Sequence, residues 1–80
     1  MKARVYVTLK PSVFDPQGSV VAHALTSMGY TDVTDVRQGK FFEVELGEGR
    51  DPAAARARVT EMADKLLANP VIESYRVEIL

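Results

Sequence analysis

The residue types that carry most enzyme chemistry are scarce in this chain. It has one histidine, His23, and no cysteine among its 80 residues. A zinc site needs three or four ligands at suitable spacing, and one histidine without thiolates does not supply them. His23 lies beside Ser19 and Ser27 on a predicted helix, where no carboxylate or nucleophile adjoins it to make it a general base. We therefore expect an exposed His23 and no catalytic, cofactor-binding or metal-ligating residue.

Other candidate chemistry has simpler structural explanations. Glu43 and Glu45 share one face of a predicted strand, where cross-strand pairing with Lys10 or Arg4 explains them better than an acid active site. The stretch Gly47–Arg50 contains a Gly-x-Gly pair, but no further glycine and no Lys-Ser/Thr follow it as a phosphate loop requires. We expect this stretch to be a flexible connecting turn.

Composition excludes several classes of partner. Ten Lys and Arg against 11 Asp and Glu give a net charge of −1, so no basic field attracts nucleic acid or anionic lipid. Tyr6 and Phe41 could form a stacking platform for RNA, but no Lys/Arg-Gly-Phe motif accompanies them. No apolar run is long enough to span a membrane or to form a signal-peptide core. We expect one cytoplasmic domain, residues 1–80, without nucleic-acid or membrane partners.

The first half of the chain predicts a strand and a capped helix. Residues 3–10 alternate apolar and polar side chains, as a half-buried strand does. Asp15 is suited to cap a helix over 16–28, Pro16 suits its first position, and Gly29 suits its end. The apolar face of this helix would comprise Val21, Ala24, Leu25 and Met28.

The second half predicts more strand, a second helix and a last strand. Gly39 permits either a hairpin turn or a bulge within residues 33–46, giving two short strands or one sharply bent ribbon. Asp51 and Pro52 repeat the capping pattern, and Asn69-Pro70 ends this helix. The apolar stripe of this helix would comprise Ala55, Val59, Met62, Ala63 and Leu66. Residues 71–80 would then form the last strand, with Val71, Tyr75, Val77 and Ile79 on one face.

This β-α-β(β)-α-β order predicts an α+β two-layer sandwich, with an antiparallel sheet and both helices on one sheet face. The other face would mix charged residues with apolar ones, which is typical of a subunit interface. A chain of this size buries little surface alone, so we expect a dimer or higher assembly. The expected oligomer interface comprises Tyr6, Phe41, Ile72 and Leu80.

Several stretches together resemble a known family. They are Val5–Lys10, Asp15–Gly18, His23–Leu25, Met28–Tyr30, Val36–Lys40, Phe42–Val44, Lys65–Glu73 and Tyr75–Glu78. In this order, and over essentially the whole chain, they resemble the PurS family of small subunits of phosphoribosylformylglycinamidine synthase.

The resemblance implies a role in the fourth step of de novo purine biosynthesis, where formylglycinamide ribonucleotide (FGAR) becomes formylglycinamidine ribonucleotide (FGAM). In that family a glutaminase subunit, PurQ, releases ammonia, and an ATP-dependent subunit, PurL, uses it. ATP, Mg and glutamine would thus be used by the partners, with no cofactor in this chain. The implied role of the small subunit is to self-associate, to dock PurL and PurQ, and to help keep the ammonia route closed to solvent.

Partner docking would then fall on two stiff segments, because rigid loops lose less entropy on binding. The candidate residues are Lys10, Asp15, Gln17, Gly18, Arg37, Gly39 and Lys40. A purely structural interpretation stands beside this one, since Asp15-Pro16 suits a helix cap and Gly39 suits a turn.

Two other functions fit a small α+β domain. One is a regulatory module that binds a small molecule at a dimer interface. The other is a hydrolase of the acylphosphatase type, which needs a phosphate-binding arginine after the first strand, and Lys10–Gly18 contains no arginine.

Overall fold

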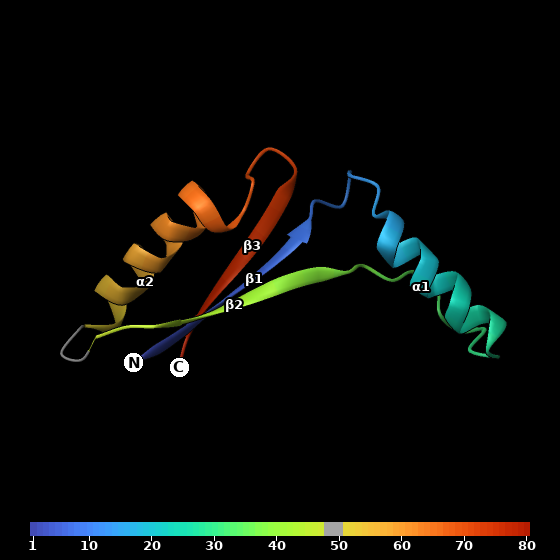
Figure 1. The fold of residues 1–80 in the computed structure, drawn as a ribbon, viewed down its shortest axis with the longest axis horizontal. Helices are drawn as coiled ribbons and strands as arrows, with labels where there is room; N and C mark the ends of the chain where they lie inside the picture. The colour runs from blue at the N-terminus through green and yellow to red at the C-terminus, as the bar shows by residue number, and fades with distance from the viewer. Residues whose placement is uncertain (48–50) are drawn as a thin grey trace.

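The computed structural model describes residues 1–47 and 51–80 as a three-stranded antiparallel sheet with two helices (Figure 1). The predicted α+β class and antiparallel sheet are confirmed. Most of the turn predicted at Gly47–Arg50 lies outside the described residues. The elements are β1 (Lys2–Leu9), α1 (Pro16–Ser27), β2 (Gly39–Glu45), α2 (Pro52–Met62), a π-helical turn η1 (Ala63–Leu67) and β3 (Glu73–Ile79).

The central strand β1 pairs with both other strands, in the order β2-β1-β3. Its alternation buries Ala3, Val5 and Val7 on one face, as predicted, and these side chains form the core with residues of α2 and η1. Val5 lies opposite Phe42 on one side and Val77 on the other, so all three point to the same sheet face. The packing of α2 against this face makes the hydrophobic core.

The position of α1 differs from the predicted sandwich. The main contacts of α2 are with β3 and β1, and α1 has no comparable contact with the sheet. Figure 1 shows α1 at the opposite end of the molecule from α2. The radius of gyration is 15.9 Å, against about 12 Å for a compact chain of this length. The prediction that both helices cover one sheet face is therefore wrong for α1, because contacts described below hold its N-terminal end away from the sheet.

The predicted ends of α1 are confirmed. Asp15 has extended backbone angles and its carboxylate accepts from the Gly18 N–H, while Pro16 occupies the first helical position. Gly29 has φ 103°, which closes the helix in the left-handed region that glycine tolerates.

Residues 33–46 contain one strand, β2 (Gly39–Glu45), and form neither a hairpin nor one long bent strand. The ladder begins at Gly39, which lies opposite Thr8, and residues 33–38 join no strand. A side chain on Gly39 would collide with the Val7 carbonyl, so glycine is needed here for close approach and not for a turn.

The last strand starts later than predicted because a turn occupies its first residues. The N–H groups of Ile72 and Glu73 both donate to the Asn69 carbonyl, and that of Val71 donates to the Asn69 side chain. Val71 is consequently exposed instead of lying on the inner face, whereas Tyr75, Val77 and Ile79 pack against the core as predicted.

The π-helical turn η1 shifts the apolar stripe of the second helix. The Ala68 N–H donates to the Ala63 carbonyl, five residues back, so the helix widens by one residue. Ala63 stays buried, but Leu67 and not Leu66 packs against the core, and Leu66 is 83% exposed. The predicted stripe is right for Ala55, Val59 and Ala63 and wrong for Leu66.

This offset gives a matched pair of substitutions. Leu67→Ala removes a core contact and should lower the free energy of unfolding by about 2 kcal/mol. Leu66→Ala should change it by less than about 0.5 kcal/mol, because in the single chain its side chain is in water. Urea unfolding at dilute protein concentration measures both. Equal losses would show that the helix continues without the π-turn.

Candidate partner-docking site at the neck

All seven predicted docking residues lie where the chain passes between the sheet and α1. We call this region the neck, residues 9–18 and 35–40. Figure 1 shows its two segments running between the sheet and α1, one leaving β1 and the other returning to β2. The structure thus brings together residues that the sequence places in two separate stretches.

The carboxylate of Asp15 joins the two segments. Asp15 is only 5% exposed. Oδ1 accepts from the Gly18 N–H at 2.9 Å, and Oδ2 accepts from the Gln38 N–H at 2.7 Å. These two bonds hold the pKa of Asp15 below its usual range, and the nearby Arg37 charge adds a smaller effect in the same direction. Asp15 is therefore an ionised structural group that ties the start of α1 to the approach of β2.

Arg37 fastens the first segment of the neck. Its Nη2 donates to the carbonyl oxygens of Lys10 at 2.9 Å and Val13 at 2.8 Å, with a longer bond to that of Leu9. One guanidinium therefore fixes the bend that follows β1. The nitrogen that makes these bonds is engaged within the chain.

Gly18 allows the helix to touch the returning segment. A Cβ at this position would collide with the Val36 carbonyl oxygen, so only glycine permits the approach. The side chains of Gln17 and Gln38 add a hydrogen bond of 3.0 Å between the same segments. Sequence reasoning did not single out Gln38, since its main role here is played by a backbone N–H that residue type does not reveal.

A few polar side chains of the neck face outward. A hollow of about 340 Å³ lies beside it, and Gln17 and Lys40 are exposed at its lining. The Lys40 ammonium is 4.0 Å from a Glu73 carboxylate oxygen and 5.6 Å from the centre of the Phe42 ring. The hollow can therefore offer positive charge and hydrogen bonds to another molecule, but it holds no serine, cysteine or histidine among its described lining residues.

The sheet face opposite α2 is open, and only part of the expected interface gathers on it. The rings of Tyr6 and Phe41 stack with centroids 6.0 Å apart, and the Arg76 guanidinium lies 4.3 Å from the Tyr6 centroid. Arg76 pairs with Tyr6 across the ladder, and Ile72 and Leu80 each lie four residues from Arg76, just beyond the two ends of β3. The structure brings Tyr6 and Phe41 together and separates the other two.

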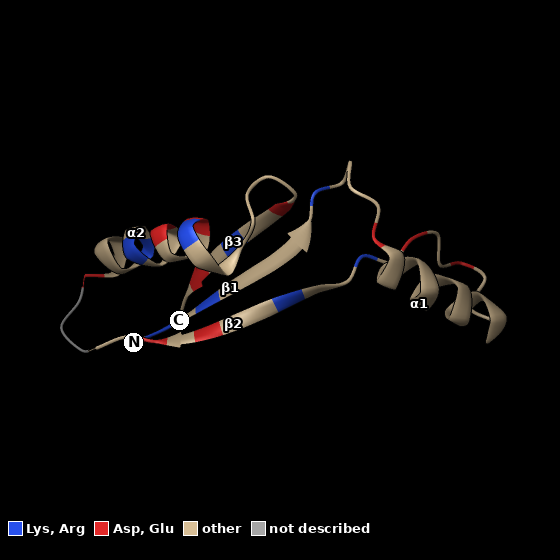
Figure 2. Cartoon of the chain, turned by 45° about the horizontal axis from the view of Figure 1, so that its top comes forward, with Lys and Arg blue, Asp and Glu red and all other residues tan. Residues whose placement is uncertain are grey.

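The acidic residues of this face are engaged in ion pairs, partly with an unexpected partner. Lys2 Nζ lies 3.3 Å from Glu43 and 3.5 Å from Glu45, and Figure 2 shows these charges at one end of the sheet. Both carboxylates raise the pKa of Lys2, Glu43 more strongly. Arg4 pairs with Glu43 at 3.8 Å, as predicted. No pair with Lys10 occurs among the described contacts, because the antiparallel register sets Lys2 and not Lys10 opposite Glu45.

Comparison with known proteins identifies the family. The sequence profile described as "PurS: Phosphoribosylformylglycinamidine (FGAM) synthase" matches residues 2–80. The chain belongs to the PurS family. It is 54% identical over 79 residues to the synthase subunit PurS of Bacillus subtilis, covering 98% of this chain and 90% of the relative. The PurS subunit of Synechocystis is 50% identical over 76 residues, covering 95% of this chain and 75% of the relative.

Solved PurS structures share the fold. A crystal structure of Bacillus subtilis PurS has a TM-score of 0.78 and 55% identity, and the match covers 96% of this chain and 94% of that one. A chain in the structure of PurLQS from Thermotoga maritima has a TM-score of 0.86 and 30% identity, covering 99% and 95%. The predicted family is confirmed, and the chain is a subunit of FGAM synthase in purine biosynthesis.

The hydrogen bond from Gln38 to Asp15 can be tested separately from the role of Asp15 as a helix cap. Asn at this position has one acceptor oxygen, so Asp15→Asn can keep the cap on Gly18 but presents an amide N–H₂ to the Gln38 N–H. We expect the Gln38 amide to exchange roughly tenfold faster with solvent, while that of Gly18 changes little. Asp15→Ala should accelerate exchange at both sites. Unchanged exchange at Gln38 in both variants would exclude the tether.

The lowered pKa of Asp15 fixes the pH range in which the neck loosens. Because the folded pKa lies below the usual 3.8, its contribution to stability is fully present above that value and is lost as the pH falls through the folded pKa. The Gly18 and Gln38 amide resonances should shift together in an NMR titration, with a midpoint below 3.8. A midpoint at or above that value would contradict the assignment, and the Asp15→Asn variant should show no such step.

Proposed function

We propose that this chain is the non-catalytic assembly subunit that joins the synthetase subunit PurL to the glutaminase subunit PurQ. The observation that supports it is the likeness, over 99% of the chain, to a chain in the structure of PurLQS from Thermotoga maritima. In this division of labour, glutamine is hydrolysed by PurQ, and PurL uses ATP and Mg to convert FGAR to FGAM. The proposed location is the cytoplasm. In the described part of the chain, no helix has the length and apolar character needed to cross a membrane.

The polar groups of this chain support an assembly role. Asp15 and Arg37 form their bonds inside the neck. Glu43 and Glu45 form ion pairs with Lys2, and Glu43 also pairs with Arg4. Within residues 1–47 and 51–80, no three His, Asp or Glu side chains gather in a way that could hold a metal ion. The chain therefore presents surfaces of fixed shape for contact with other molecules.

The neck is the proposed docking surface for the larger subunits. Lys10, Gln17 and Lys40 would make the contacts, because these side chains are at least partly exposed. Asp15, Gly18, Arg37 and Gly39 would act indirectly by holding the backbone in one shape. A surface fixed in this way loses little conformational entropy when a partner binds.

The open sheet face is the proposed site of one self-association contact. The stacked Tyr6 and Phe41 form its centre, with Arg76 over the Tyr6 ring, a combination common at interface centres. Ile72 and Leu80, both exposed, would contact the second copy at the two ends of β3.

Reconstitution tests the assembly role. With purified PurL and PurQ, omission of this chain should abolish FGAM formation from glutamine, because ammonia released by PurQ no longer reaches PurL. FGAM formation by PurL supplied with ammonium salts should persist. Product formation is followed with each nitrogen source. Glutamine-driven synthesis at full rate without the chain, or turnover by the chain alone, would refute the proposal.

The same assay locates the docking surface when the concentration of this chain is varied. The double variant Lys10→Ala/Lys40→Ala should weaken binding to the larger subunits by roughly tenfold, so about ten times more of it is needed for half-maximal FGAM formation from glutamine. Lys65→Ala on η1 is the matched control, since this lysine is also exposed and paired with a glutamate, at 2.7 Å. Equal effects of the two changes would place docking elsewhere.

A further inference from the structure

The loop that joins η1 to β3, residues 68–72, is held in one conformation by Asn69. The Asn69 carbonyl oxygen accepts from the N–H groups of Ile72 at 3.1 Å and Glu73 at 2.7 Å. Its side-chain oxygen accepts from the Val71 N–H at 3.1 Å. The N–H of Asn69 itself donates to a Glu73 carboxylate oxygen at 2.6 Å. Because these bonds run in both directions across the loop, its backbone is fixed before any partner binds.

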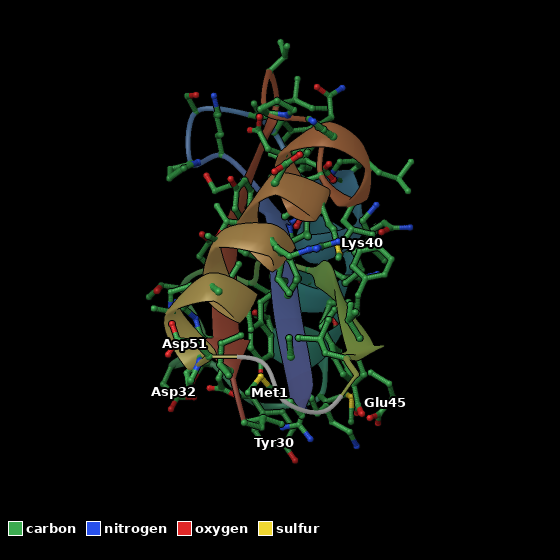
Figure 3. The ribbon with its side chains drawn as sticks, turned by 90° about the vertical axis from the view of Figure 1, so that its left-hand side faces the viewer. Met1, Tyr30, Asp32, Lys40, Glu45 and Asp51 are labelled. Atoms are coloured by element: carbon green, nitrogen blue, oxygen red, sulfur yellow. The ribbon has the colours of Figure 1, made fainter. Side chains whose placement is uncertain are left out.

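The outermost part of this loop is apolar and exposed. We call Pro70, Val71 and Ile72 the crest. Val71 is 77% exposed and Ile72 40%, and Pro70 is exposed beside them. In Figure 3 the loop is the uppermost part of the ribbon, and Figure 2 shows no charged residue in it. One exposed valine on a loose loop would need no explanation, but here a fixed backbone presents it at a projecting point.

The crest continues the proposed docking surface of the neck. The Lys10 N–H donates to the Ile72 carbonyl at 2.9 Å, and the Lys40 ammonium lies 4.0 Å from a Glu73 carboxylate oxygen. Lys10 is partly exposed, and within residues 1–47 and 51–80 no carboxylate lies close enough to form an ion pair with it. A partner that meets Lys10 therefore meets the crest beside it, and it can supply the missing negative charge.

We propose that the crest is an anchor for a larger subunit, and that Val71 enters an apolar pocket whose rim carries a carboxylate for Lys10. The inference rests on the proposed function, because that function makes the neck a docking surface. A β-branched side chain on a fixed backbone suits such a pocket, since little conformational freedom is lost on entry. Asn69 is then a positioning residue that acts through the backbone at Val71.

Substitutions of Val71 test the anchor with purified PurL and PurQ, when the concentration of this chain is varied. Val71→Asn should raise the concentration needed for half-maximal FGAM formation from glutamine about tenfold, because a polar group enters the apolar pocket. Val71→Asp should raise it about tenfold further, because the introduced carboxylate meets the carboxylate of the rim. Val71 is exposed in the single chain, so the fold should survive, and far-UV circular dichroism checks it. Ala57→Asp on exposed α2 is the matched charge control, and should act as wild type does.

Substitutions of Asn69 test the positioning role while the crest side chains stay unchanged. Asn69→Ala removes the acceptor of the Val71 N–H. It should speed the exchange of that amide with solvent, measured by NMR, and should raise the half-maximal concentration several-fold. Asn69→Ser should restore part of both properties, because a hydroxyl at this position can accept the same N–H.

The outcomes separate the anchor from the function on which it rests. If the wild-type chain fails to support synthesis from glutamine, the proposed function falls, and the anchor with it. If wild type is active and Val71→Asp is equally potent, the anchor alone is overturned. Equal potency of Val71→Asp and Val71→Asn would overturn the acidic rim. A Val71→Asp chain that loses self-association in sedimentation would show that a second copy covers the crest, which also overturns the proposal.

Discussion

The carboxylate of Asp15 decides how the two halves of this molecule are related. Its two oxygens bind backbone N–H groups that lie far apart in sequence, at Gly18 and Gln38. One bond starts a helix, and the other fastens that helix to the segment that leads into β2. Because the group is ionised and nearly buried, both bonds are of the stronger, charge-assisted kind. The carboxylate therefore fixes the direction in which α1 leaves the sheet.

Holding α1 away from the sheet has a consequence for stability. A small chain gains most of its stability from apolar burial, and here α1 adds little to the core formed by β1 and α2. The fully buried side chains are alanines and valines, such as Val5, Val7 and Val59. The neck thus keeps in one place a helix that packing within the chain does not hold, and much of the apolar side of that helix stays exposed.

The sequence predicts the local structure well and the position of α1 poorly, for a physical reason. Alternation in β1 and the Asp-Pro caps report on neighbouring residues, and both are confirmed. The apolar spacing of α1 indicates that one side avoids water, but it does not say which chain covers that side. The prediction for Leu66 is wrong because the π-turn at Ala63–Leu67 adds one residue to the turn and so breaks the 3.6-residue spacing that the prediction assumed.

In the candidate site, too, the sequence indicates local features but not the contacts between distant segments. Residue types in the neck indicated Asp15, Gly18, Arg37 and Gly39 as candidate docking residues, and docking stays a prediction. The structure shows these residues bonded to, or closely packed against, the backbone within the chain. Sequence alone left open whether they bind partners or shape a turn. The structure gives each a local structural task, so under the proposed docking role the neighbouring exposed side chains would supply the specificity for a partner.

A subunit that joins others without reacting has different requirements from an enzyme. An active site keeps polar groups unpaired and strained for use in a transition state. In the described residues of this chain, Asp15 and Arg37 in the neck, and Lys2, Glu43 and Glu45 at one sheet end, are instead paired within the fold. These pairs leave the exposed side chains of Lys10, Gln17 and Lys40 in the neck, and the stacked rings of Tyr6 and Phe41 on the open sheet face, as the proposed means of recognition. Under the proposed function, such a surface would hold the larger subunits in register while the chemistry of FGAM synthesis takes place in them.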